Sequence, residues 1–216
     1  VYAVVPPGTT TESFLPDPFL VALAARSDAI FSHHSALQLR GAAHSAWSVC
    51  TAFTASRRVT LRFRGATVRI LPHPTALARR DMIELGTRKV ERRAQLLRVT
   101  GPERTLVEGF REPDLVGGVE ELVASAAGLA TLDVDLLARL LECHALRRLW
   151  AAVGWFLEAH AQAFGLGSDD LAQFERHRPK APLYLARGAR GGALVARWNL
   201  VLPPGVGRGD PDAGQS

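Results

Sequence analysis

The segment VTLRFRGATVRI, residues 59–70, carries the clearest structural pattern in the sequence. Apolar residues occupy every second position up to Phe63, and the alternation resumes at Val68 after Gly65-Ala66. Alternation of period two is typical of strands with one buried face, and a two-residue turn that starts with glycine is typical of a type II′ hairpin. The segment is therefore predicted to be a β-hairpin with one polar face.

This hairpin register would bring like charges together. With a turn at Gly65-Ala66, Arg64 is expected opposite Thr67, and Arg62 directly opposite Arg69. Facing like charges cost up to about 1 kcal/mol. They persist more easily when an anion lies over them, although the two arginine tips can also splay apart into water.

Arginines are concentrated on this hairpin and on the segment that follows it. Contacts between such side chains and phosphates support nucleic-acid binding, and an acidic protein surface would fit equally well. No aromatic residue is interleaved with the arginines on their face, since Phe63 belongs to the alternating apolar set, so stacking on single-stranded nucleic acid is not indicated. The candidate binding residues are Arg57, Arg58, Arg62, Arg64, Arg69, Arg88, Arg92 and Arg93.

The surrounding sequence predicts an α/β (α+β) fold with a small, largely antiparallel mixed sheet over residues 47–99. Helices are expected first, one from Asp17-Pro18 and one over residues 33–40 with Ser32 as its cap. Strands are then expected at residues 82–85 and 96–99, on either side of a charged turn or exposed strand. A helical half follows, in which the strongest apolar periodicity covers residues 146–164. A closing strand pair is expected at residues 183–185 and 195–202.

The composition favours a cytoplasmic protein with an anionic partner. The chain has 216 residues, a net charge of +5 and a pI of about 10.0. The basic balance is also explained by a compositional bias, because only Lys89 and Lys180 are lysines. Cys50 and Cys143 are expected to be buried and reduced. No apolar run reaches the length of a membrane span, and no signal peptide is recognisable.

The sequence contains no persuasive catalytic set. Asp81, Glu84 and Glu91 could be arranged as in a metal-dependent nuclease, but the acid-x-Lys strand signature is absent, since Thr87 stands two positions before Lys89. Adjacent residues on a helix point about 100° apart, so His33-His34 is a poor chelating pair. No phosphate-binding glycine motif occurs, and Gly188–Gly192 is expected to be a hairpin turn. No metal and no cofactor are therefore expected.

Several short motifs, taken in order, resemble AbiEi-type antitoxins. The segment FSHHSAL at residues 31–37, followed by Gly41, resembles the family's Y-x-S-x-x-S-A-L…G helix. The segment ERTLVE at residues 103–108 resembles its E-R-T-L-x-D helix, with Glu108 where the family usually has Asp. Arg178-Pro179, Tyr184-Leu185 and RWNLVLP at residues 197–203 resemble its C-terminal ending.

The resemblance implies a domain arrangement. Residues 1–6 resemble the last strand of a winged-helix wing, so residues 1–13 are expected to be the remnant of an upstream winged helix and its linker. Residues 14–204 would form the AbiEi-like C-terminal antitoxin domain, and residues 205–216 a disordered tail. Sequence-specific binding of promoter DNA would depend mainly on the winged helix, which is almost absent from this chain.

The resemblance also implies a function. It predicts a non-catalytic antitoxin and transcriptional autoregulator of a type IV toxin–antitoxin system, of the kind associated with abortive infection. Its functional partner would be a nucleotidyltransferase toxin, neutralised without a stable complex. Two alternatives stay open, namely a stand-alone DNA-binding regulator or interaction module without a toxin, and a nuclease-like domain, active or degenerate.

Overall fold

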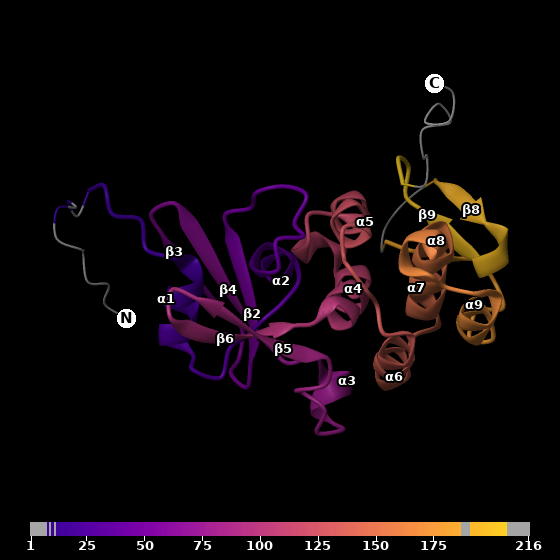
Figure 1. The fold of residues 1–216 in the computed structure, drawn as a ribbon, viewed down its shortest axis with the longest axis horizontal. Helices are drawn as coiled ribbons and strands as arrows, with labels where there is room; N and C mark the ends of the chain where they lie inside the picture. Colours follow the sequence, from indigo (N-terminus) through magenta and orange to yellow (C-terminus); the bar gives the residue numbers. More distant parts are fainter. Residues whose placement is uncertain (1–7, 9, 11, 187–190, 207–216) are drawn as a thin grey trace. The chain divides into compact units, whose positions relative to one another are not determined.

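The computed structural model describes residues 8, 10, 12–186 and 191–206. The chain divides into two compact units, an N-terminal unit Val1–Thr105 and a C-terminal unit Leu106–Ser216. Helices and two separate sheets make an α+β fold, which confirms the predicted fold class (Figure 1). The wing-like segment at residues 1–6, most of the glycine-rich turn and most of the tail lie outside the described residues.

The N-terminal unit is built on a six-stranded mixed sheet with the order β3-β4-β2-β1-β6-β5. The pairs β2/β4 and β1/β6 are parallel, and the other three pairs are antiparallel. Strands β3 and β5 are therefore the two edges of the sheet. The strands are β1 (Ile30–Phe31), β2 (Val49–Thr54), β3 (Val59–Phe63), β4 (Ala66–Pro72), β5 (Thr87–Arg92) and β6 (Gln95–Thr100).

The β3/β4 hairpin forms as predicted, but the predicted register is wrong by one turn position. Phe63 pairs with Ala66 and Arg62 pairs with Thr67, so the turn residues are Arg64 and Gly65. Gly65 has φ +79°, and a glycine takes that conformation without the steric cost that other residues meet. Arg62 and Arg69 are consequently diagonal neighbours on one face instead of directly opposed.

The predicted strand at residues 82–85 is also wrong, because these residues form a turn that leads into β5. The charged segment at residues 88–93 is predicted to be either a turn or an exposed strand, and the structure shows the strand. It is β5, which ends in a turn at Arg93 and Ala94, both with positive φ.

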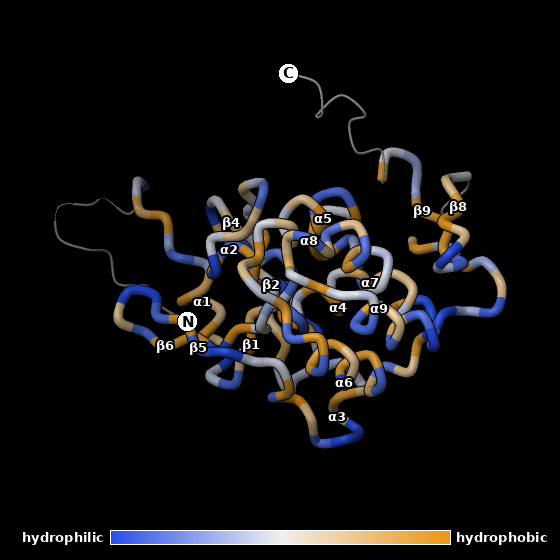
Figure 2. Tube along the Cα trace, turned by 45° about the vertical axis from the view of Figure 1, so that its right-hand side comes forward, coloured by the Kyte–Doolittle hydropathy of each residue, from blue (hydrophilic) through white to orange (hydrophobic). Residues whose placement is uncertain are grey.

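One face of the sheet and helix α1 (Pro18–Ala25) enclose the core of the N-terminal unit. Phe19 and Ala22 of α1 are buried with residues of the sheet strands, including Phe31, Ala52 and Val99. Helices α2 (His34–Leu39) and α3 (Thr75–Ala78) complete the unit. Hydrophobic and hydrophilic segments alternate along the trace, as half-buried elements require (Figure 2).

The C-terminal unit is mainly helical, and the boundary between the units falls inside α4 (Pro102–Arg111). The predicted helix at residues 146–164 is interrupted at His160, which divides it into α7 (Arg147–Ala159) and α8 (Ala161–Phe164). The other helices are the 3-10 helix η1 (Pro113–Leu115), α5 (Val119–Ala127), α6 (Val134–His144) and α9 (Ser168–Glu175).

The closing strands form a three-stranded sheet with the order β7-β9-β8. Its strands are β7 (Leu183–Tyr184), β8 (Ala193–Val195) and β9 (Leu200–Leu202). The predicted continuous strand at residues 195–202 is broken by the 3-10 helix η2 (Ala196–Trp198) and by Asn199, whose φ is +46°. No helix in the part of the chain that the structure describes has both the length and the apolar character to cross a membrane.

Candidate anion-binding surface and pocket

Four of the predicted arginines form a patch on and beside the β3/β4 hairpin. Arg62 and Arg69 share the outer face of the hairpin, because the residues that alternate with them, such as Leu61 and Val68, face the core. Arg57 and Arg58 lie in the loop that precedes β3. We call Arg57, Arg58, Arg62 and Arg69 the hairpin patch.

The hairpin patch differs from the other arginine clusters in its lack of counter-charges. Within the ranges 12–186 and 191–206, none of its four side chains makes an ion pair. By contrast, Arg98 bonds Glu84 and Arg111 bonds Glu108. The patch therefore presents positive charge at a sheet edge that is available to an anionic partner.

The remaining four candidates lie in other environments. Arg88 is exposed on β5, at the opposite edge of the sheet from β3, and its Nη1 donates to the carbonyl of Thr87. Arg64 lies in the β3/β4 turn, and its Nη1 donates to the carbonyl of Glu12. The structure therefore does not unite all eight arginines on one face.

Arg92 and Arg93 at the end of β5 share one carboxylate, that of Asp17. The Asp17 side chain is only 3% exposed, and its Oδ2 lies 2.8 Å from Arg92 Nε and 3.6 Å from Arg93 Nε. Its Oδ1 accepts a hydrogen bond from the Phe19 backbone N–H at 3.0 Å, which caps α1. The Arg92 guanidinium also lies 4.6 Å from the centre of the Phe19 ring, within cation–π range.

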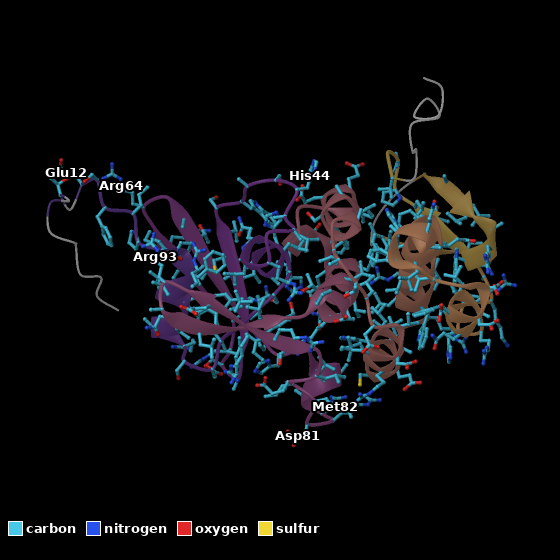
Figure 3. The ribbon with its side chains drawn as sticks, in the orientation of Figure 1. Glu12, His44, Arg64, Asp81, Met82 and Arg93 are labelled. Atoms are coloured by element: carbon cyan, nitrogen blue, oxygen red, sulfur yellow. The ribbon has the colours of Figure 1, made fainter. Side chains whose placement is uncertain are left out.

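The turns of the two hairpins border one pocket of about 290 Å³. Figure 3 shows Arg64 and Arg93, one from each turn, at the same end of the N-terminal unit. The pocket is lined by Leu15, Pro16, Asp17, Pro18, Trp47, Ser48, Arg64, Gly65, Ala66, Arg92 and Arg93. The pocket therefore brings arginines from the two edges of the sheet together with Trp47.

Trp47 is the residue that the sequence pattern did not reveal. It precedes β2 and is remote in sequence from every arginine of the pocket, so the prediction that no aromatic residue accompanies the arginines fails here. Its ring makes an edge contact with His34 at a centroid distance of 4.9 Å. Its carbonyl accepts a hydrogen bond from Gln38 Nε2 at 2.9 Å, so both ring and backbone are held by α2.

The family-like motif at residues 31–37 forms the buried connection from β1 to α2. Ser35 Oγ accepts a hydrogen bond from the Thr51 N–H at 2.8 Å, and the Ser32 N–H donates to the Thr51 carbonyl, which joins the motif to β2. The predicted cap Ser32 instead contacts His33 Nδ1 at 2.9 Å, and His33 is the N-cap of α2. These contacts give the motif a structural role.

The motif at residues 103–108 is likewise buried. Arg104 Nη1 donates to the carbonyls of Ile83 at 2.5 Å and Leu85 at 3.0 Å, and so holds the turn before β5. In the C-terminal unit, Glu108 bonds Arg111 Nε at 2.5 Å, and its other oxygen lies 3.4 Å from His144 Nε2. Because these groups are buried, the local dielectric constant is low, and the hydrogen bonds and ion pairs are stronger than they would be in water.

The C-terminal motif ties the closing sheet to two helices. Trp198 Nε1 donates to Glu158 of α7 at 2.6 Å, and Arg197 bonds both Glu158 and Glu175 of α9. Asn199 Nδ2 donates to the carbonyl of Pro179 at 2.8 Å. The charge and the amide of this motif therefore serve packing within the C-terminal unit.

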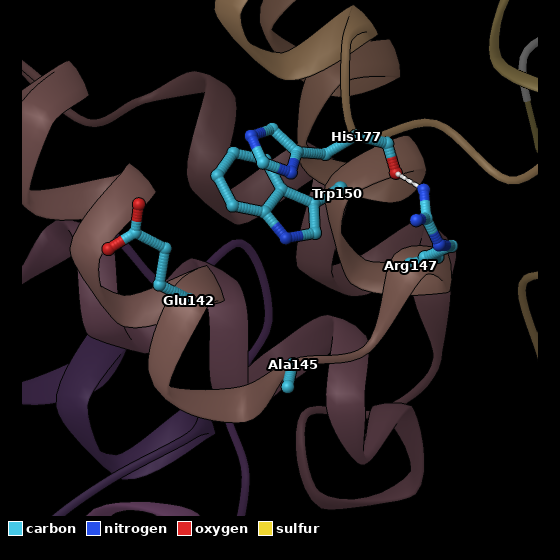
Figure 4. A pocket seen from close by; sticks show the side chains of 5 residues that line it. All are labelled: Glu142, Ala145, Arg147, Trp150 and His177. Carbon is cyan, nitrogen blue, oxygen red and sulfur yellow. Dashed lines mark hydrogen bonds between the residues drawn. The ribbon is translucent and has the colours of Figure 1, made fainter.

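A second pocket of about 240 Å³ lies in the C-terminal unit (Figure 4). Trp150 stacks on His177 with ring centroids 4.0 Å apart, and Arg147 donates to the His177 carbonyl at 3.5 Å. Glu142 and Ala145 complete the lining. None of the predicted binding residues lies here.

The acidic residues considered for a nuclease site do not form a cluster. Asp81 is exposed in a turn with φ +55°, Glu84 bonds Arg98 at 2.7 Å, and Glu91 is exposed on β5. Over the residues that could be described, no three or more His, Cys, Asp or Glu side chains are placed to share a metal ion.

Comparison with known proteins gives a likeness at the level of the fold. No family model matches the chain, and no curated protein matches it. The fold is similar to the crystal structure of the RV2827C protein from Mycobacterium tuberculosis, with a TM-score of 0.58 and 19% sequence identity. The match covers 93% of this chain and 71% of that one, and at this identity it shows a shared fold alone.

Proposed function

We propose that the chain is the antitoxin and transcriptional autoregulator of a type IV toxin–antitoxin system, acting in the cytoplasm without catalysis. The proposal joins the ordered AbiEi-like motifs of the sequence to one structural observation, the hairpin patch. The motifs supply internal contacts, whereas the patch is an outward-facing group of four arginines without ion pairs among the described residues.

The chemistry of the patch suits the phosphates of DNA. A guanidinium offers a planar fork of donors that matches a phosphate, and each neutralised phosphate releases condensed counterions. Such contacts position a protein on DNA and carry no base sequence information. In this proposal the patch strengthens binding to promoter DNA without selecting its sequence.

The antitoxic activity would be directed at a nucleotidyltransferase, with neutralisation that needs no stable complex. This part rests on the resemblance. A nucleotidyltransferase reading frame beside the gene would favour it over a stand-alone regulator.

The DNA-binding part is tested by charge reversal. Arg62→Glu with Arg69→Glu should weaken retention of promoter DNA by about tenfold or more at low salt, because two phosphate contacts become repulsions. The matched control is Arg139→Glu with Arg176→Glu, which changes the net charge equally at exposed positions of the C-terminal unit. Equal retention by both double variants would show that the patch is only solvated surface.

A further inference from the structure

The pocket between the two hairpin turns has an unusual charge for its size. Three arginines and one aspartate line it, which leaves two positive charges in excess within about 290 Å³. The Asp17 carboxylate is already engaged by the α1 N-terminus and by Arg92. The one carboxylate of the pocket is therefore already bonded within the protein, and the remaining positive charge favours binding of an anion.

The three arginines differ in how freely they could contact a ligand. Arg92 is held by the Asp17 bond and by its position over Phe19. The Arg93 side chain is 71% exposed, and among the residues that the structure describes its one ion pair is the longer 3.6 Å contact with Asp17. Arg64 has one bond through Nη1 to a backbone carbonyl, which leaves other donors of its guanidinium for a ligand. Arg64 and Arg93 are thus the two groups that can hold an anion.

Apolar walls accompany this charge. Trp47 lines the pocket, and its ring is positioned in advance by the edge contact with His34. Leu15 is 60% exposed, and its side chain lies against Gly65, where an added Cβ would be 3.2 Å from Leu15 Cδ2. A planar ring could stack on Trp47, as bases stack on aromatic side chains in nucleic-acid complexes.

We infer that this pocket binds a nucleoside phosphate, with the phosphate between Arg64 and Arg93 and the base against Trp47. A mononucleotide and the phosphorylated end of a nucleic-acid strand share this chemistry. Ligand pockets have volumes of about 300–1,000 Å³, so this cavity of about 290 Å³ lies at the small end of the range, which favours a small ligand such as one nucleotide. The inference does not depend on the antitoxin proposal, because the hairpin patch takes no part in it.

The test measures ligand binding to the whole chain by calorimetry. The probes are the four ribonucleoside triphosphates, inorganic phosphate, and a short oligonucleotide with and without a 5′-phosphate. We expect at least one nucleotide or the phosphorylated oligonucleotide to bind with a Kd below about 1 mM. Binding of the oligonucleotide that requires its 5′-phosphate, without binding of the mononucleotides, would identify a strand end as the source of the phosphate.

Matched variants assign the binding to the pocket. Arg64→Gln with Arg93→Gln should weaken it by about tenfold or more, because both phosphate contacts are lost. Trp47→Leu should do the same, while Trp47→Phe retains binding. Arg139→Gln with Arg176→Gln, which removes equal charge at exposed positions outside both the pocket and the hairpin patch, should leave it unchanged. Circular dichroism confirms that each variant is folded.

Two results would overturn the inference. One is no binding of any probe other than inorganic phosphate. The other is binding that survives Arg64→Gln with Arg93→Gln in folded protein. Because DNA retention is tested at Arg62 and Arg69, failure here and failure of the proposed function are distinguishable.

Discussion

The carboxylate of Asp17 joins the start of α1 to the end of β5 by accepting a hydrogen bond from Arg92 Nε at 2.8 Å. The same side chain caps α1 and is almost completely buried. One residue thus stabilises a helix, orders the turn of an edge hairpin and sets the charge of the pocket. Its neighbour Arg93 contacts it only weakly and stays exposed.

Substitution of Asp17 should separate these roles. Asp17→Ala removes both the cap and the ion pair, and it should lower the free energy of unfolding by about 2 kcal/mol. Asp17→Asn keeps a good capping oxygen and loses only the charge, so about half of that loss is expected. Urea unfolding of both variants checks this. Equal losses would mean that the cap contributes nothing.

Packing around Trp198 predicts that one added methyl group in α7 lowers the stability of the protein. A Cβ on Gly154 would lie 2.2 Å from Trp198 Cζ3, although alanine is ordinarily the better helix former. Gly154→Ala should therefore destabilise the protein by about 1–3 kcal/mol.

A matched control exists at the end of α5. A Cβ on Gly128 would come no closer than 3.6 Å to its nearest neighbour, and Gly128 has a negative φ of −83°. Gly128→Ala should change the melting temperature little. If the two alanine variants melt alike, the close contact between Gly154 and Trp198 is not present in solution.

The thiol of Cys50 should make stability depend on alkaline pH. Burial raises the pKa of Cys50 from 9.0 to about 12. The folded pKa therefore exceeds the unfolded one, so the unfolded state loses its proton first. The stabilising contribution is fully present below pH 9.0 and is lost as the pH rises from 9.0 towards 12.

Unfolding in urea at a series of pH values measures this effect. Above the unfolded pKa, the free energy of unfolding should fall by up to about 1.4 kcal/mol per pH unit more steeply than in Cys50→Ala. Identical pH slopes for the two proteins would show that Cys50 is accessible to solvent.

The hairpin patch should determine the salt dependence of DNA binding. Each phosphate contact contributes about −0.9 to the slope of log K against log salt. Neutralising Arg57 and Arg58 should therefore make the slope shallower by about 1.8 if both contact phosphates. A filter-binding series across salt concentrations measures the slope, and an unchanged slope would place the DNA elsewhere.

Local sequence patterns predicted which segments form strands and helices better than they predicted the strand register and the tertiary contacts between them. The alternation around Arg62 correctly separates the two faces of the hairpin, although the turn lies one position earlier than predicted. The faces survive this error because moving the turn by one residue changes each pairing by two positions, which preserves side-chain parity. Strand β1 has two residues, too few to show any period.

The pocket could not be predicted because tertiary structure creates it. Trp47, Arg64 and Arg93 come from three separate segments, and the arginines belong to hairpins at opposite edges of the sheet. The failed strand at residues 82–85 has a similar origin, since Arg104 binds two carbonyls of that segment and holds it as a turn. Long-range contacts of this kind leave no local pattern.

We propose that this chain protects cells from a nucleotidyltransferase toxin through an anion-binding surface. Growth during co-expression with a nucleotidyltransferase, if one is encoded beside its gene, tests that proposal most directly. We predict that the chain restores growth, and that Arg62→Glu with Arg69→Glu reduces the rescue whereas Arg139→Glu with Arg176→Glu does not. Continued growth arrest in the presence of the folded, unsubstituted chain would contradict the account.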